Sequence, residues 1–161
     1  MTDVPEAALA IGAWSHVWSS AVGVDLRRAA WEALELPESF EDCKQEYWNV
    51  FQVGSDGPRI SLLLHHALGR PGSSVREDWL RVMDHLGLEW NNIHLPPDQL
   101  GAACEVYACA IARNEPMLIE ELRARYLLPW CEAARAILAG DNSRLAFLPE
   151  HFEQDLRAAG A

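Results

Sequence analysis

The stretch His94-Leu95-Pro96-Pro97-Asp98-Gln99-Leu100-Gly101 places two prolines and an aspartate directly before a long apolar segment. The segment repeats apolar residues at helical spacing, which predicts a helix ending near Asn114: Leu100, Cys104, Tyr107 and Ile111. Proline suits the first turn of a helix, and an acid there faces free N–H groups and the positive end of the helix dipole. Asp98 therefore has two open interpretations, a helix cap or a charged ligand-binding residue at a loop–helix junction.

The chain as a whole favours helices. It holds 23 alanines and 21 leucines against 9 valines, 6 isoleucines and one threonine. Helix formers thus far outnumber the β-branched residues typical of strands, and no run of strict alternation occurs. The length of 161 residues suits one compact domain with a substantial core. We predict a single all-α domain over residues 1–161, a bundle of about seven to eight helices.

Capping and breaking residues divide the chain into segments. The expected helices cover residues 5–23, 25–36, 39–54, 60–68, 74–87, 100–114 and 116 onward, with a last short helix over 145–156. Ser39 and Ser74 each begin a capping box, and Asp25 is placed to cap the second helix. Pro129 is expected to kink or interrupt its helix, and Pro149 is expected to interrupt the last short helix. The first helix should bury one face: Leu9, Ala10, Ala13, Trp14, Val17 and Trp18.

The charge and the N-terminal sequence limit the partners. The net charge of −11 repels nucleic acid and anionic lipid headgroups and favours a basic partner. The acidic start of the chain lacks the features of a secretory signal, and no stretch approaches the ~20 apolar residues that span a bilayer. We expect a cytoplasmic protein that neither binds nucleic acid nor inserts into a membrane.

Motifs for metal binding and catalysis are absent from the sequence. The adjacent His65 and His66 would point about 100° apart on a helix, which is unsuitable for one metal ion. No phosphate loop, dinucleotide fingerprint or nucleophile elbow occurs. We therefore expect no metal, no cofactor and no enzymatic activity; the enzymatic alternative would depend on His94, Asp98 or Glu105. Four dispersed cysteines are interpreted as reduced core residues: Cys43, Cys104, Cys109 and Cys131.

The tryptophans allow two interpretations, and one pair of arginines allows another comparison with a known signal. The seven tryptophans either fill the core or line an apolar groove with polar edges. Trp48 is the best candidate for exposure because it lies off the apolar stripe of its helix, which is formed by Phe40, Cys43, Tyr47, Val50 and Phe51. The pair Arg27-Arg28 lacks the apolar run of an export signal, so we interpret it as a solvated helix face.

Three segments in order resemble the TorD/DmsD/NarJ family of molybdoenzyme maturation chaperones. Glu46-Tyr47-Trp48-Asn49-Val50-Phe51 is similar to the aromatic-x-x-Leu-Phe signature of that family, with valine replacing leucine. A loop with glycine and proline comes next at 54–61, and 95–101 is similar to the proline-x-Asp-His-leucine motif. The segments 125–130 and 147–152 are compatible with the C-terminal half of such a chain. Two departures are Gln99, which replaces the usual histidine, and Ile60, which stands where an acid often precedes the serine.

This resemblance implies a TorD-like helical bundle that binds the twin-arginine signal peptide of a molybdoenzyme catalytic subunit and assists its folding, cofactor insertion and export. The peptide-binding residues it suggests are Tyr47, Trp48, Val50, Phe51, Pro97, Asp98 and Gln99. In this reading Tyr47, Val50 and Phe51 form an apolar wall, although plain core packing is an equal alternative. Asp98 would be a polar anchor, with Gln99 as a neutral hydrogen-bonding partner. The rival function is a generic helical adaptor for an amphipathic helix. Either a monomer or a dimer is compatible with the sequence.

Overall fold

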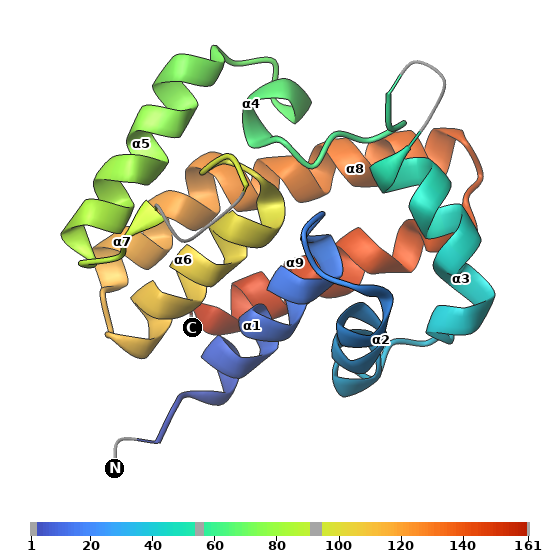
Figure 1. Ribbon diagram of the computed structural model, residues 1–161, viewed down its shortest axis with the longest axis horizontal. Helices are drawn as coiled ribbons and strands as arrows, with labels where there is room; N and C mark the ends of the chain where they lie inside the picture. Colours follow the sequence, from blue (N-terminus) through green and yellow to red (C-terminus); the bar gives the residue numbers. More distant parts are fainter. Residues whose placement is uncertain (1–2, 54–56, 91–94, 161) are drawn as a thin grey trace.

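Helices form most of the described backbone in the computed structural model, which describes residues 3–53, 57–90 and 95–160 (Figure 1). The helices are α1 (Glu6–Trp18), α2 (Val24–Ala33), α3 (Phe40–Tyr47), α4 (Leu64–Ala67), α5 (Gly72–His85), α6 (Leu100–Ala112), α7 (Pro116–Leu122), α8 (Leu128–Gly140) and α9 (Phe147–Ala159). A π-helical turn, Arg123–Leu127, joins α7 and α8 into one continuous helix. Counted in this way, the described residues form eight helices and no strand, which confirms the predicted all-α bundle.

The centre of the bundle is the close packing of α1 on α6, with α2 and α9 also against α1 (Figure 1). Gly101 makes this approach possible. A Cβ atom at Gly101 would lie 2.7 Å from the Cα of Ser19 and 2.8 Å from the carbonyl oxygen of Ser15. Both atoms belong to the backbone of α1 or of the residue that directly follows it, so α1 and α6 would have to separate to admit a side chain.

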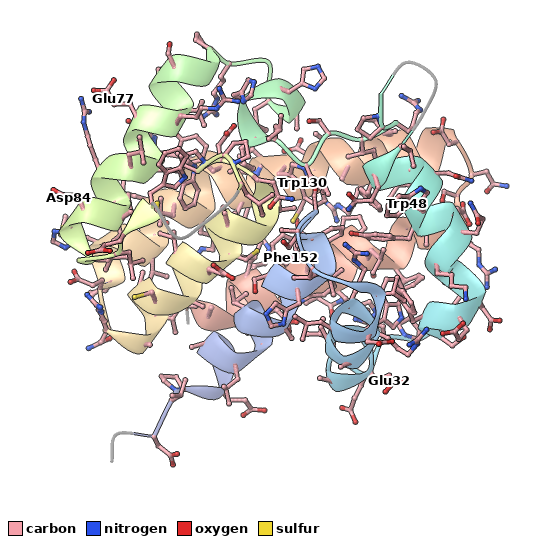
Figure 2. The ribbon with its side chains drawn as sticks, in the orientation of Figure 1. Glu32, Trp48, Glu77, Asp84, Trp130 and Phe152 are labelled. Carbon is pink, nitrogen blue, oxygen red and sulfur yellow. The ribbon has the colours of Figure 1, made fainter. Side chains whose placement is uncertain are left out.

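Tryptophan side chains fill the core, which is one of the two interpretations that the sequence allowed. Trp18 lies at its centre, with its ring centroid 5.0 Å from that of Trp130 and 5.2 Å from that of Phe51. Trp130 and Phe152 also contact each other (Figure 2). Trp48 remains 48% exposed on the π-helical turn Trp48–Gln52 that continues α3, which confirms the prediction for this residue. The buried apolar side chains form one cluster.

Several predicted helix boundaries were wrong for tertiary reasons. Only Leu64–Ala67 of the expected helix 60–68 is helical, because the preceding residues pair with the segment before α6. Helix α5 begins at Gly72 without a side-chain cap, and the hydroxyl of Ser74 donates to the carbonyl of Pro71. Helix α2 starts after Gly23, and Asp25 pairs with Arg28. Ser39 does cap α3, accepting from the backbone N–H of Asp42 at 3.2 Å. The expected stop at Gly54 lies outside the described residues.

The prolines and the face of α1 also differ from expectation. Pro149 lies in the first turn of α9, where its missing N–H is tolerated, so it does not interrupt that helix. The helix runs on through Pro129, directly after the π-helical turn, whose wider spacing shifts the hydrogen-bond register. On α1, Leu9 is 61% exposed while Ile11 is buried. Helix α1 contacts α2, α6 and α9, so its buried surface is broader than one stripe.

Candidate functional site

The three segments that carry the family resemblance meet in space through one extended strap, residues 57–63. At one end of the strap, the N–H of Ile60 donates to the carbonyl of Val50 at 3.0 Å. At the other end, the N–H of Leu100 donates to the carbonyl of Leu62 at 2.8 Å, and the N–H of Leu64 donates to the carbonyl of Asp98 at 2.9 Å. The strap therefore connects the π-helical turn after α3 with the loop that precedes α6.

Asp98 is completely buried and holds the helix that comes after the strap. One carboxylate oxygen accepts from the backbone N–H of His65 at 3.0 Å and lies 2.6 Å from Nδ1 of the same residue. The other oxygen accepts from Nε of Arg76 at 3.2 Å. The sequence thus correctly indicated that Asp98 caps a helix, but it indicated the wrong helix, because Asp98 caps α4 rather than α6. Both of its oxygens are already occupied by groups of this chain.

Gln99 is the residue that caps α6. Its Oε1 accepts from the N–H groups of Gly101 at 2.7 Å and Ala102 at 3.2 Å. Its Nε2 donates to the carbonyl of Trp18 at 2.7 Å. An amide supplies an acceptor and a donor at once, and a carboxylate supplies only acceptors. Gln99 therefore satisfies the N-terminus of α6 and the C-terminus of α1 together, and the hydrogen bonds expected of it go to its own chain.

Arg27 and Tyr47 donate hydrogen bonds to the carbonyl groups at the C-terminus of α1. The carbonyl of Val17 accepts from the Tyr47 hydroxyl and from Nε of Arg27, and the carbonyl of Ser19 accepts from Nη2 of Arg27 at 2.6 Å. These carbonyls lack partners within the helix and lie at its negative end, which favours a cation. Arg27 is only 3% exposed, so its reading as a solvated residue was wrong. Burial raises the pKa of the Tyr47 phenol.

The structure brings the expected binding residues together, but most of them face inward. Tyr47 and Phe51 are buried in the core cluster, and Val50 packs partly buried against it. Pro97 is buried as well. Their burial fits the core-packing alternative, which leaves Trp48 as the exposed member of the set. The π-helical turn and the loop before α6, which carry these residues, hold the strap in place.

An open hollow lies between the strap, α4 and α8 and is called the strap pocket below. Its volume is about 160 Å³, and its lining combines apolar side chains with three polar ones, Arg59, Ser61 and His66. The apolar members include Ile60, Ala67, Trp130, Ala133 and Ile137. Nε1 of Trp130 donates to the carbonyl of Ser61 at 3.0 Å and fixes the wall. Sequence reasoning missed this role of Trp130, because nothing local indicates that residues about 70 positions apart share a pocket.

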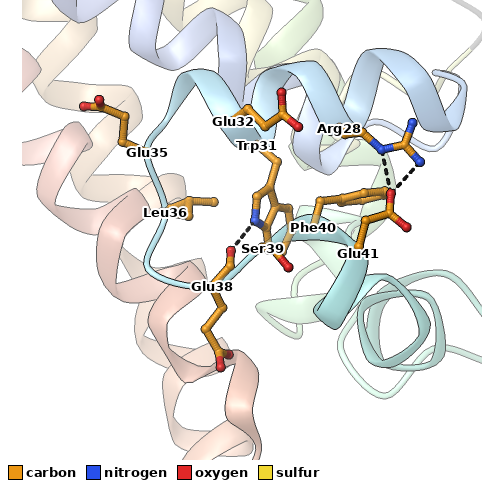
Figure 3. A pocket seen from close by; sticks show the side chains of 9 residues that line it. All are labelled: Arg28, Trp31, Glu32, Glu35, Leu36, Glu38, Ser39, Phe40 and Glu41. Carbon is orange, nitrogen blue, oxygen red and sulfur yellow. Dashed lines mark hydrogen bonds and ion pairs between the residues drawn. The ribbon is translucent and has the colours of Figure 1, made fainter.

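A second hollow, the α2–α3 pocket, has an acidic rim and an aromatic floor (Figure 3). Its volume is about 200 Å³. The floor contains Trp31 and Phe40, and Nε1 of Trp31 donates to the carbonyl of Glu38 at 2.8 Å. The rim carries four carboxylates and one cation: Glu32, Glu35, Glu38, Glu41 and Arg28. Sequence reasoning missed this pocket as well; the recurrence of glutamate over residues 32–41 was its only signal.

The buried cysteines of the chain are not activated for chemistry. All four are free. Burial raises the pKa of Cys43 to about 11 and the pKa of Cys104 well above its ordinary value, so both thiols stay protonated near neutral pH. Within the described ranges, no three His, Cys, Asp or Glu residues gather as a metal site would require. No helix in the same ranges has the length and apolar character needed to cross a membrane.

Comparison of the chain with protein-family models, curated proteins and solved structures finds no match. What the chain binds must therefore be inferred from the geometry and charge of the described residues and from the order of their motifs.

Proposed function

We propose that this protein is a maturation chaperone of the TorD/DmsD/NarJ type. It binds the twin-arginine signal peptide or N-terminal segment of a molybdoenzyme catalytic subunit in the cytoplasm, before export. In this proposal the chain acts by binding and contributes no catalytic residue, cofactor or metal. The proposal includes the expectation that the subunit, rather than nucleic acid or membrane, is the partner.

The observation that carries the proposal is the joining of the three motif segments by the strap. The motif segments 47–51, 54–61 and 95–101 are separate in sequence, and the strap, which contains the described residues 57–61 of the second segment, is hydrogen-bonded to both of the others. Proximity of the three segments is what a shared binding surface requires. Near this unit lie an exposed indole, Trp48, and the strap pocket.

The chemistry of the surface suits the two parts of a twin-arginine peptide. Such a peptide combines a cationic end with an apolar stretch, and the chain has a net charge of −11. Opposite charge accelerates the encounter and favours basic over acidic peptides. The apolar stretch requires a different surface, and the strap pocket offers alanine, isoleucine and tryptophan side chains, with Arg59 and His66 beside them.

The proposal is tested by titrating a synthetic peptide into the full-length protein. The peptide carries two adjacent arginines and then a leucine- and alanine-rich run. We expect binding to the natural protein, and on the order of tenfold weaker binding to Ala133→Arg, because the long side chain fills the strap pocket. Ala136→Arg is the matched control, since Ala136 is exposed on the same helix and does not line the pocket.

Two results would overturn the proposal. The first is absence of binding by the natural protein. The second is equal affinity for a peptide whose arginines are replaced by glutamine, which would favour the generic adaptor for amphipathic helices. Co-purification from the native host supplies the second arm: we expect a molybdoenzyme catalytic subunit that still carries its signal peptide, recovered with the natural protein and with Ala136→Arg but depleted with Ala133→Arg.

A further inference from the structure

We propose that two copies of this chain associate through a hollow between α5 and α7, called the α5–α7 pocket below. In this dimer the exposed side chain of Met117 in each copy enters the α5–α7 pocket of the other. The association is separate from the peptide binding proposed above, and it selects a dimer where the sequence allows a monomer or a dimer. Helices α5 and α7 lie at the end of the molecule opposite α3 (Figure 1).

Side-chain pairs join α5 to the α7 segment at both ends of the pocket. At one end, Asp78 of α5 accepts from Nη2 of Arg125 at 3.0 Å and from the hydroxyl of Tyr126, in the π-helical turn that follows α7. At the other end, Nε2 of His85 lies 3.4 Å from a carboxylate oxygen of Glu115, directly before α7. The two helices run in opposite directions, so the pocket lies between these pairs and is already formed in the single chain.

The inside of the pocket is apolar and small. Its volume is about 250 Å³, larger than that of the strap pocket. Apolar and aromatic side chains form its floor: Val82, Leu118, Leu122 and Tyr126. Pockets for small molecules and cofactors usually have volumes of about 300–1,000 Å³. A side chain from another protein surface therefore suits this pocket better than a cofactor does.

A suitable apolar side chain lies beside the pocket on the same helix. Met117 is 82% exposed, and it is one helical turn from Glu121, which lines the pocket. The flexible thioether side chain of methionine adapts to irregular apolar gaps. In a two-fold dimer both copies present the same surface, so a side chain that projects beside a hollow on one copy meets the hollow of the other. Met117 and the pocket thus make this surface complementary to itself.

The charges around the pocket favour a second copy over the cationic peptide. The lining carries two carboxylates, Asp78 and Glu121, and two guanidinium groups, Arg81 and Arg125, so its formal charge is zero. Two copies that each carry a net charge of −11 repel each other least where the local charge is balanced. Arg81 lies on α5 and Glu121 on α7, so a two-fold axis allows each to pair with the other across the dimer. A neutral pocket gives no electrostatic attraction to a cationic peptide.

Sedimentation equilibrium of the full chain, from about 1 µM to about 500 µM, tests the association. We expect the mean mass to rise with concentration from that of one chain toward that of two. Met117→Glu should weaken dimerisation on the order of tenfold, because it brings a carboxylate to an apolar pocket. Leu9→Glu is the matched control, since Leu9 is also exposed and lies outside the lining of the pocket. Circular dichroism shows that both variants keep the fold.

A charge exchange supplies the second arm of the test. Arg81→Glu and Glu121→Arg should each weaken dimerisation, and a chain that carries both should recover it, because both pairs across the dimer return with reversed signs. Failure of the double variant to recover overturns the two-fold arrangement.

Three other results would overturn the dimer proposal. The first is a mass that stays that of one chain over the whole range. The second is equal dimerisation by Met117→Glu and Leu9→Glu. The third is a monomer whose affinity for the arginine peptide described above falls on the order of tenfold in Met117→Glu, which would assign the pocket to the peptide. The first two results leave the chaperone proposal unaffected, because the strap pocket and Ala133 lie outside this surface.

Discussion

The C-terminus of α1 and the α2–α3 pocket both depend on an arginine, and the two arginines are neighbours in the sequence. Arg27 is buried and gives its donors to backbone carbonyls of α1. Arg28 is partly exposed and gives its donors to Asp25 and Glu41. On a helix, successive residues point about 100° apart, so one of the pair enters the core and the other faces the rim of a pocket.

The two regions differ in how many of their polar groups already have a hydrogen-bonding or ionic partner within the chain. At the end of α1, side chains from three parts of the fold donate to the last carbonyls, so those carbonyls are already occupied. At the α2–α3 pocket the acids outnumber the cations. Buried polar groups with partners, as in the first region, should therefore stabilise the protein more than the exposed pairs of the second. Four substitutions test that difference, beginning with the largest effect.

Asp98→Ala should cause the largest loss of stability. The substitution removes the acceptor of three hydrogen bonds and leaves His65 and Arg76 without their buried partner. Because Arg76 is partly exposed, the cost is below that of breaking a fully buried pair, and the loss of three hydrogen bonds to a carboxylate should lower the free energy of unfolding by about 3–4 kcal/mol. Urea denaturation monitored by circular dichroism measures it. Asp98→Asn keeps an acceptor and should lose less; a loss below about 1 kcal/mol for Asp98→Ala would contradict the structural role.

Arg27→Met should destabilise the protein by about 3 kcal/mol, because it leaves the Ser19 carbonyl without a donor and weakens the bonding of the Val17 carbonyl. Arg28→Met is the matched variant, one residue away, and should have a much smaller effect on stability. The same urea experiment measures both. Similar losses from the two variants would remove the distinction on which the comparison rests.

Ser39→Ala should lower the free energy of unfolding by about 1 kcal/mol, since Ser39 caps α3 through the N–H of Asp42. Ser74→Ala is the control, because Ser74 caps no helix and its hydroxyl donates to the carbonyl of Pro71. Thermal unfolding of the two variants should show a lower midpoint only for Ser39→Ala. The opposite order would mean that α5 begins where the sequence suggested.

The smallest effect should be a pH dependence at the rim. Hydrogen bonds from Lys44 and Arg28 lower the pKa of Glu41, and a hydrogen bond from Arg144 lowers the pKa of Glu38. Because the folded pKa lies below the unfolded one, each pair stabilises the fold above the unfolded pKa, and this contribution disappears as the pH falls through the folded pKa. NMR titration of the carboxyl carbons should show the pKa of Glu38 rising in Arg144→Gln. An unchanged value would exclude that pair in solution.

Sequence patterns predicted the local features of the fold well. The excess of alanine and leucine indicated an all-α chain, the capping box at Ser39 began α3, and Pro116 began α7. The stripe of the third helix correctly placed Tyr47 inside and Trp48 outside. Each of these features depends on residues within one or two turns of each other, where spacing alone is informative.

The candidate site was predictable only in part. The sequence singled out the segments that the strap joins, 47–51 and 95–101, but assigned Asp98 to the wrong helix and placed Arg27 in solvent. Asp98 holds His65, which lies 33 residues away, and Gln99 holds the carbonyl of Trp18, which lies 81 residues away. A motif shows that a polar group is present but does not show which distant backbone it satisfies.

The sequence by itself determined that this chain is helical, strongly acidic and rich in tryptophan, because composition and periodicity are local properties. The tertiary structure alone decided which polar groups are consumed by the fold and which remain for a ligand. The physical reason is that a buried donor or acceptor must find a partner wherever the packing of helices places one. At the C-terminus of α1, packing occupies Arg27, Tyr47 and Gln99 with backbone carbonyls, whereas the glutamates of the α2–α3 pocket stay at the surface.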